Sequence, residues 1–216
     1  MKKVAFLLII SLIVFSGVAA AQVGGDFVFR LGYDLSGEMD ADFSVDGSNM
    51  EEMSDTLDVE SGYSLTAEYR LAAADNFAYG AGITYQLDRD IDEDDTDVSF
   101  SFTPIYLLGE YRMADNPIYF VGHLGYNFFS LDDIGIDEEN IDIIDQSNSG
   151  GLYYALGGGI EFEERYVFEM LYTVNNGSTE IEFEGEEVPN GNGVEDGVLE
   201  GDFKYTKFTI SLGIKF

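Results

Sequence analysis

The last nine residues, Phe208-Thr-Ile-Ser-Leu-Gly-Ile-Lys-Phe216, alternate apolar side chains with polar or small ones. In a β-strand, successive side chains point to opposite faces, so this segment has one apolar face and one polar face. The apolar face comprises Phe208, Ile210, Leu212, Ile214 and Phe216. A strand face this apolar is suited to contact with lipid, and the rest of the chain can be tested against that expectation.

The N-terminus has the features of a secretory signal. Lys2 and Lys3 precede an apolar run over residues 4–15, and small residues at 19–21 provide a cleavage site. The run is shorter than the roughly 20 apolar residues that a membrane-spanning helix needs. We therefore expect a signal peptide over residues 1–21, and a single β-barrel domain over residues 22–216 that crosses a membrane with strands.

Seven further segments alternate in the same way, so the chain is predicted to form eight strands. The predicted strands are 26–35, 62–72, 77–87, 98–113, 118–131, 152–162, 166–174 and 208–216. In the fourth of these, Phe100 and Phe102 fall out of phase with Leu107. A β-bulge near Pro104 would absorb that slip.

The predicted connections are of two kinds. Residues 73–76, 114–117 and 163–165 are short and read as tight turns, whereas 36–61, 88–97, 132–150 and 175–202 are longer and acidic. Short periplasmic turns opposite long external loops are typical of outer-membrane barrels. An even number of strands would then place both termini in the periplasm.

A hairpin unit occurs twice and indicates which residues face inward. Leu65-Thr-Ala-Glu-Tyr-Arg-Leu-Ala72 and Leu107-Leu-Gly-Glu-Tyr-Arg-Met-Ala114 match closely, and an Asp-Asn turn follows each. In both copies Glu and Arg lie on the face opposite Tyr and Leu. An Arg facing lipid at the bilayer midplane costs roughly 2 to 4 kcal/mol, so these charges belong inside the barrel. We predict lumen ion pairs among Glu68, Arg70, Glu110 and Arg112.

With these features together, the mature chain resembles the small outer-membrane barrels of the OmpX, OmpA-membrane-domain and opacity-protein type. The resemblance implies an all-β, eight-stranded antiparallel up-and-down barrel in the bacterial outer membrane. It also implies a monomer whose partners are outer-membrane lipid, lipopolysaccharide and the barrel assembly machinery. The C-terminal aromatic strand, ending at Phe216, would be the signal that this machinery reads. In OmpA-type proteins a peptidoglycan-binding domain follows the barrel, and that activity is not expected here.

The charge of the chain is strongly negative, at −32 formally, with 42 Asp and Glu against 10 Lys and Arg. Nucleic acid is excluded as a partner because phosphate binding needs clustered Lys and Arg. The acidic segment from Asp88 places Asp at positions one, three and five of an EF-hand count, but Glu93 replaces the required Gly and Ser99 the bidentate Glu. We expect no specific metal site, and weak binding of divalent cations by the acidic loops stays open.

Catalysis finds little support in the residues. His123 is the only histidine, the chain has no Cys, and no Gly-x-Ser-x-Gly motif occurs. Lipid A deacylases of this size are known for a His-x-Ser pair, whereas Gly125 stands at the corresponding position here. We expect no enzyme activity and no cofactor, and we interpret His123 as an interior hydrogen-bonding residue.

The side chains that face the lumen distinguish between the remaining functions. Small inward residues such as Gly80, Gly82 and Gly157 leave room for a water path, whereas inward charges can bridge the lumen in an ion-pair network. We favour a closed barrel with a structural or surface-interaction role through its acidic loops. A narrow cation-preferring pore is the alternative, and a secreted lipocalin-like barrel that binds an apolar ligand is the second.

Overall fold

The computed structural model describes residues 24–45, 53–91, 99–131, 141–185 and 197–216. The predicted signal peptide and most of the acidic segment 88–97 lie outside these residues. Within the described part of the chain, no helix is long and apolar enough to cross a bilayer.

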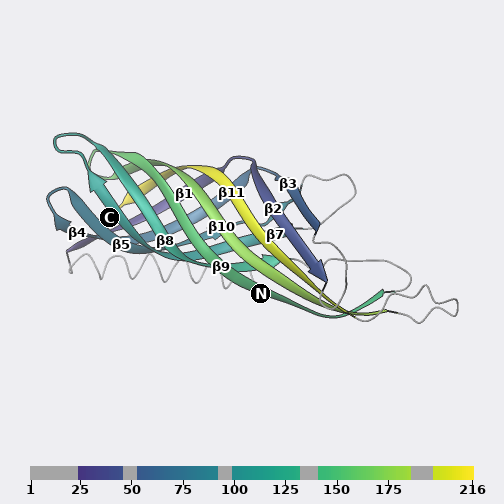
Figure 1. Ribbon diagram of the computed structural model, residues 1–216. Coiled ribbons are helices and arrows are strands. Elements are labelled where there is room, and N and C mark those ends of the chain that lie inside the picture. The colour runs from purple at the N-terminus through teal and green to yellow at the C-terminus, as the bar shows by residue number, and fades with distance from the viewer. Residues whose placement is uncertain (1–23, 46–52, 92–98, 132–140, 186–196) are drawn as a thin grey trace, which may run out of the picture.

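Eight antiparallel strands form a closed ring (Figure 1). In order around the ring they are β1 (Gly25–Asp34), β4 (Gly62–Ala74), β5 (Phe77–Gln86), β7 (Ser99–Arg112), β8 (Ile118–Leu131), β9 (Ile141–Phe162), β10 (Tyr166–Gly185) and β11 (Gly197–Lys215). The pairing of β1 with β11, from Val28 opposite Lys215 to Asp34 opposite Thr209, closes the ring. The predicted eight-stranded up-and-down barrel is confirmed.

The wall continues beyond the ring at one end. There β2 (Gly37–Val45) follows β1 along the edge of β11, and β3 (Met53–Val59) pairs with β2 and leads into β4. Figure 1 shows β9, β10 and β11 running past the ring alongside this hairpin. The short β6 (Arg89–Asp90) pairs with β7, and a bridge from Val59 to Ile91 links β3 to it. We call this part the extension. Its described residues are 37–45, 53–59, 89–91, 99–103, 128–131, 141–151, 175–185 and 197–206.

The polarity of the wall inverts between the ring and the extension. On the ring, the outer face carries exposed apolar side chains such as Leu107, Phe120 and Leu156, between 56% and 70% exposed. On the extension, most exposed side chains are polar, and many of these are acidic. They include Glu38, Asp42, Asp55, Asp58, Glu180, Glu182, Glu200 and Asp202. A broad exposed apolar surface marks a membrane contact, so the ring suits lipid and the extension suits water.

Two details of the predicted strands differ in the structure. Much of the segments 36–61 and 175–202, predicted as loops, continues the strands, because apolar and acidic residues alternate there with the period of two that a barrel wall requires. The bulge predicted near Pro104 is wrong: β7 pairs with β8 without interruption, from Phe100 opposite Leu131 to Arg112 opposite Tyr119. Phe100 and Phe102 face the interior, since the interior of the extension is apolar.

Pro104 instead coincides with a break on the other side of β7. The pairing of β5 with β7 ends at Ile83 and Ile105, and the next pairing on that side of β7 joins Arg89 to Phe100. Proline has no backbone N–H to donate, so it sits where a ladder is interrupted.

Candidate functional site

Eight charged side chains meet inside the ring and form one connected ion-pair network. Four are acidic and four are basic. They are Glu68, Glu110, Glu161 and Glu169, with Arg30, Arg70, Arg112 and Lys215. Successive side chains of a strand point to opposite faces, and the residues next to each of these eight are apolar and face lipid. The eight charged side chains therefore point inward. The equal numbers leave these eight residues formally neutral, which suits a site from which water is largely excluded. The exposed Asp26 joins them only at the edge, 3.6 Å from Lys215.

Arg70 is the centre of the network. Its Nη2 atom lies 2.6 Å from Glu68 Oε2 and 3.1 Å from Glu169 Oε2, and its Nη1 atom contacts Glu110. One guanidinium therefore joins carboxylates from three strands, β4, β7 and β10. The planar donors of arginine suit such multiple contacts better than the single ammonium of lysine. The chain across the lumen continues through Arg112, whose Nη1 lies 2.6 Å from Glu161 Oε2.

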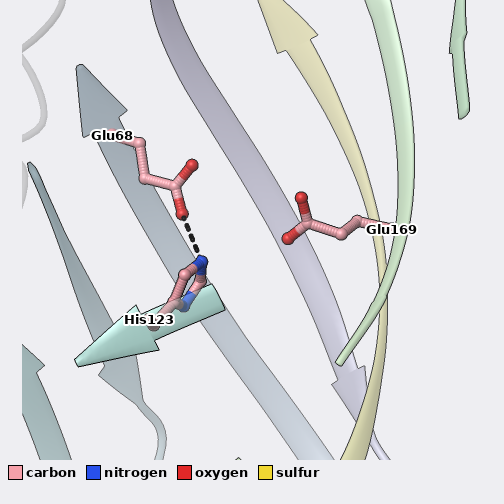
Figure 2. Close-up of side chains that lie close together, drawn as sticks. All are labelled: Glu68, His123 and Glu169. Carbon is pink, nitrogen blue, oxygen red and sulfur yellow. Dashed lines mark ion pairs between the residues drawn. The ribbon is translucent and has the colours of Figure 1, made fainter. Parts of the chain in front are cut away.

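Glu68, His123 and Glu169 present ligand atoms within 4.8 Å of one another, and this arrangement is the best metal-like cluster among the described residues. Figure 2 shows them projecting from separate strands, with Glu169 across from the other two. Arg30 contacts Glu68 Oε1 through Nη2, and the same nitrogen lies 3.1 Å from Glu169 Oε1. The guanidinium thus already bridges the two carboxylates. A divalent cation would have to displace it, so the cluster does not fit a metal site.

His123 lies inside the barrel, as the alternation predicts. Its ring stacks on Tyr106 with centroids 4.3 Å apart, and Nδ1 lies 3.2 Å from the hydroxyl of Tyr153. Its Nε2 atom is 3.7 Å from Glu68 Oε1. The nearby hydroxyl of Tyr106 donates a hydrogen bond of 2.7 Å to the same carboxylate. His123 is therefore surrounded by aromatic rings and by charges that are already paired.

Tyrosine rings fill the lumen beside two of its inward glycines, Gly82 and Gly159. A Cβ added to Gly82 would lie 2.7 Å from the ring of Tyr106, and one added to Gly159 would lie 2.5 Å from that of Tyr119. The hydroxyl of Tyr119 donates to Glu169 at 2.8 Å. The small residues therefore do not leave a water path at these positions, contrary to the room predicted for them. They let large rings approach the wall and reach the network.

A second cluster fills the interior of the extension. It consists of buried apolar and aromatic side chains: Met39, Ala41, Val59, Phe100, Phe102, Phe129, Leu131, Phe203 and Tyr205. Phe102 stacks on Phe129 with ring centroids 4.8 Å apart and lies near the ring of Tyr205. The lumen is thus filled twice, by ion pairs within the ring and by aromatic rings within the extension. The pattern 39–43 of alternating apolar and acidic residues is a signal for this cluster that was available in the sequence.

A smaller charged group lies between these two clusters, and sequence reasoning missed it. Asp34 Oδ2 lies 2.7 Å from Lys207 Nζ and also contacts Arg89 Nη2. The hydroxyls of Ser64 and Thr209 donate to its other oxygen. Arg89 and Lys207 fell within or beside segments read as loops, so nothing indicated that they would face the lumen.

The predicted assembly residues lie on the outer face of β11 and at its end. Phe208, Leu212, Ile214 and Phe216 are exposed, and Ile210 is half-buried. The backbone N–H of Phe216 donates to the carbonyl of Phe27 at 2.8 Å, and the reverse bond is 3.0 Å. The last residue of the chain therefore takes part in the seam that closes the ring. Its reading by an assembly machinery stays a prediction.

No protein-family model matches the chain, and no curated protein matches it. Solved structures do. The outer membrane protein OprG from Pseudomonas aeruginosa is 20% identical, with 89% of this chain and 96% of that one covered and a TM-score of 0.58. Ail, the attachment invasion locus protein of Yersinia pestis, is 13% identical, with 89% and 99% covered and a TM-score of 0.44. Together with the apolar outer face, the likeness to OprG identifies the fold as that of a small outer-membrane β-barrel protein.

Proposed function

We propose that the chain is an outer-membrane barrel with a closed lumen, whose extension presents an acidic surface outside the cell. The observation that carries this proposal is the inversion of polarity along continuous strands. On β11, Leu212 is 61% exposed on the apolar ring, whereas the outward residues Asp202 and Glu200 of the same strand are acidic. A wall that leaves the bilayer must change its outer face in this way.

The role of the protein then lies at its surface, as an envelope or surface-interaction component. Both clusters in the lumen support this role, because neither the ion pairs nor the aromatic rings leave an open channel through the described part of the barrel. Divalent cations are the expected mobile partners of the acidic surface, and they also bind the phosphates of lipopolysaccharide. Short turns and both chain ends would face the periplasm.

The absence of cysteine from the chain allows a direct test of location and orientation. Single cysteines at Asp55, in the extension, and at Asp75, in the turn after β4, are compared on intact cells with a membrane-impermeant maleimide. We expect labelling at position 55 and labelling at position 75 only after the cells are lysed. The reverse pattern would show the opposite orientation. Recovery of the protein in the soluble fraction would support the secreted-barrel alternative instead.

A second candidate function is the binding of a small apolar molecule within the extension. Two observations favour it: the interior there is apolar, as in the lipocalin-like alternative, and the ladder between β5 and β7 is interrupted beside Pro104. Phe102 lies next to this interruption and in the aromatic cluster. The test is binding of a fluorescent naphthylamine probe by purified protein. Substitution Phe102→Ala should increase binding, whereas Phe120→Ala, on the lipid-facing surface, should not.

A further inference from the structure

A small cavity lies in the lumen between the ion-pair network and the aromatic cluster. Its volume is about 30 Å³, and seven of the eight ring strands contribute to its lining. Arg30 borders it beside the network, and Phe102 borders it beside the aromatic cluster. A space of this size holds one or two species as large as a water molecule.

The lining has one sign of charge. Among the described residues, it includes two cations, Arg30 and Lys207, and no carboxylate. This composition is unexpected in a chain with 42 acidic residues and 10 Lys and Arg. Arg30 is matched by acids within the neutral network. Lys207 belongs instead to the group in which two cations, Lys207 and Arg89, share the single carboxylate of Asp34. That group is left with an excess of one positive charge.

Unpartnered donors line the same cavity. Gln86 Nε2, Asn175 Nδ2 and Thr173 Oγ1 are buried and have no hydrogen-bond partner among the described residues. The side-chain oxygen of Gln86 accepts a hydrogen bond of 2.7 Å from Lys207 Nζ. This bond fixes the orientation of the amide, so the NH₂ group is the end without a partner. Buried polar groups without partners cost free energy, so they indicate a bound species that accepts hydrogen bonds.

From the excess positive charge, the lack of carboxylates in the lining and the three unpartnered donors, we propose that this cavity binds one small monovalent anion of halide size. The anion neutralises the excess charge of the Asp34, Arg89 and Lys207 group and accepts hydrogen bonds from Gln86, Thr173 and Asn175. It is a structural ligand that links β5, β10 and β11 at the level where the ring meets the extension. Two water molecules are the competing occupants, and they would satisfy the donors without balancing the charge.

The test uses protein purified from outer membranes in detergent. Crystals grown in bromide should show an anomalous scattering peak in the cavity, within hydrogen-bond distance of Lys207 Nζ. The midpoint of thermal unfolding should rise with chloride or bromide at constant sodium, relative to gluconate, by about 3 to 5 °C for each tenfold rise in halide above the dissociation constant. No bromide peak and equal midpoints in chloride and gluconate would overturn the proposal.

Two variants and one control variant locate the effect. Thr173→Val keeps the shape of the side chain and removes one donor, so the halide-dependent rise should shrink. If the cavity binds no anion, this variant is neutral or more stable in both salts, because an unpartnered hydroxyl has been removed. Lys207→Met should abolish the rise and the bromide peak. Thr179→Val, on β10 but outside the cavity, loses its hydrogen bond to Ser147 and should keep the full rise. An unchanged rise in Thr173→Val would contradict the assigned site.

Discussion

Arg70 Nη2 lies 3.1 Å from Glu169 Oε2 across the lumen, although the two residues are 99 positions apart in the chain. The same guanidinium binds Glu68 on its own strand. Its charge therefore ties together strands that are not neighbours in the ring, in a region where water is scarce. The loss of one partner leaves a buried charge behind.

The first prediction follows from that contact. Arg70→Ala removes the central cation and leaves Glu68, Glu110 and Glu169 with reduced compensation, so the barrel should lose on the order of 3 to 5 kcal/mol of stability. Lys204→Ala breaks an exposed pair with Asp40 and should cost about 1 kcal/mol or less. Urea unfolding in detergent measures both variants. Equal midpoints would show that the lumen is well hydrated.

The second prediction concerns conductance. Because ion pairs fill the ring and aromatic rings fill the extension, the unmodified protein should be silent in planar bilayers. Arg70→Ala alone opens only the ring, because aromatic rings still fill the extension. Conductance steps are therefore expected when Phe102→Ala is added. Any current through the double variant should prefer cations, since the acidic surface concentrates them, and this preference should weaken as salt rises. Reproducible steps from the unmodified protein would instead establish a narrow channel, and cation selectivity of those steps would establish the cation-preferring pore.

The third prediction separates two kinds of glycine. Gly82→Ala places a Cβ 2.6 Å from Glu68 Cγ and 2.7 Å from the ring of Tyr106, so it should destabilise the barrel by about 1 to 3 kcal/mol. Gly109→Ala, on the lipid face, meets only the ring of Phe77 at 3.7 Å and should change stability by less than about 0.5 kcal/mol. The unfolding free energies of the two variants test this difference. A well-tolerated Gly82→Ala would mean that Tyr106 does not fill the lumen there.

The fourth prediction concerns assembly. Phe216 closes the seam with Phe27, and its ring lies 6.0 Å from that of Phe29. Phe216→Ala keeps the backbone bonds but removes the ring, so less folded protein should reach the outer membrane while export of the precursor continues. Phe128→Ala removes another exposed ring and serves as the control. If quantitative blots of outer-membrane fractions give equal levels for both variants, the terminal ring is not an assembly signal.

The ring could be predicted from the sequence because its signals are local. Alternation in the strands and the repeated Glu-Tyr-Arg unit place Glu68, Arg70 and Glu110 on one face without knowledge of any partner. The pairing of Arg70 with Glu169 could not be predicted, since it depends on which strands face each other across the closed barrel. The register between neighbouring strands does not show which side chains meet across the lumen.

The sequence predicts loops in the extension because acidic residues are depleted in ordinary strands. There the alternation has the opposite meaning: Met39 and Ala41 point inward, whereas Glu38 and Asp42 point to water. A search for apolar and acidic alternation beside each lipid-facing strand would have found it. The group of Asp34, Arg89 and Lys207 was missed for the same reason, as two of its three members lie at the border of segments assigned to loops.

The inversion of polarity along one wall is the central claim, and spin labels on β11 test it most directly. Single cysteines at Leu212 and at Asp202 are labelled in protein reconstituted into lipid vesicles, and collisions with oxygen and with a water-soluble nickel complex are compared by electron paramagnetic resonance. The label at 212 should collide mainly with oxygen, as in lipid, and the label at 202 mainly with nickel, as in water. Lipid-like exposure at position 202, or water-like exposure at 212, would contradict the account.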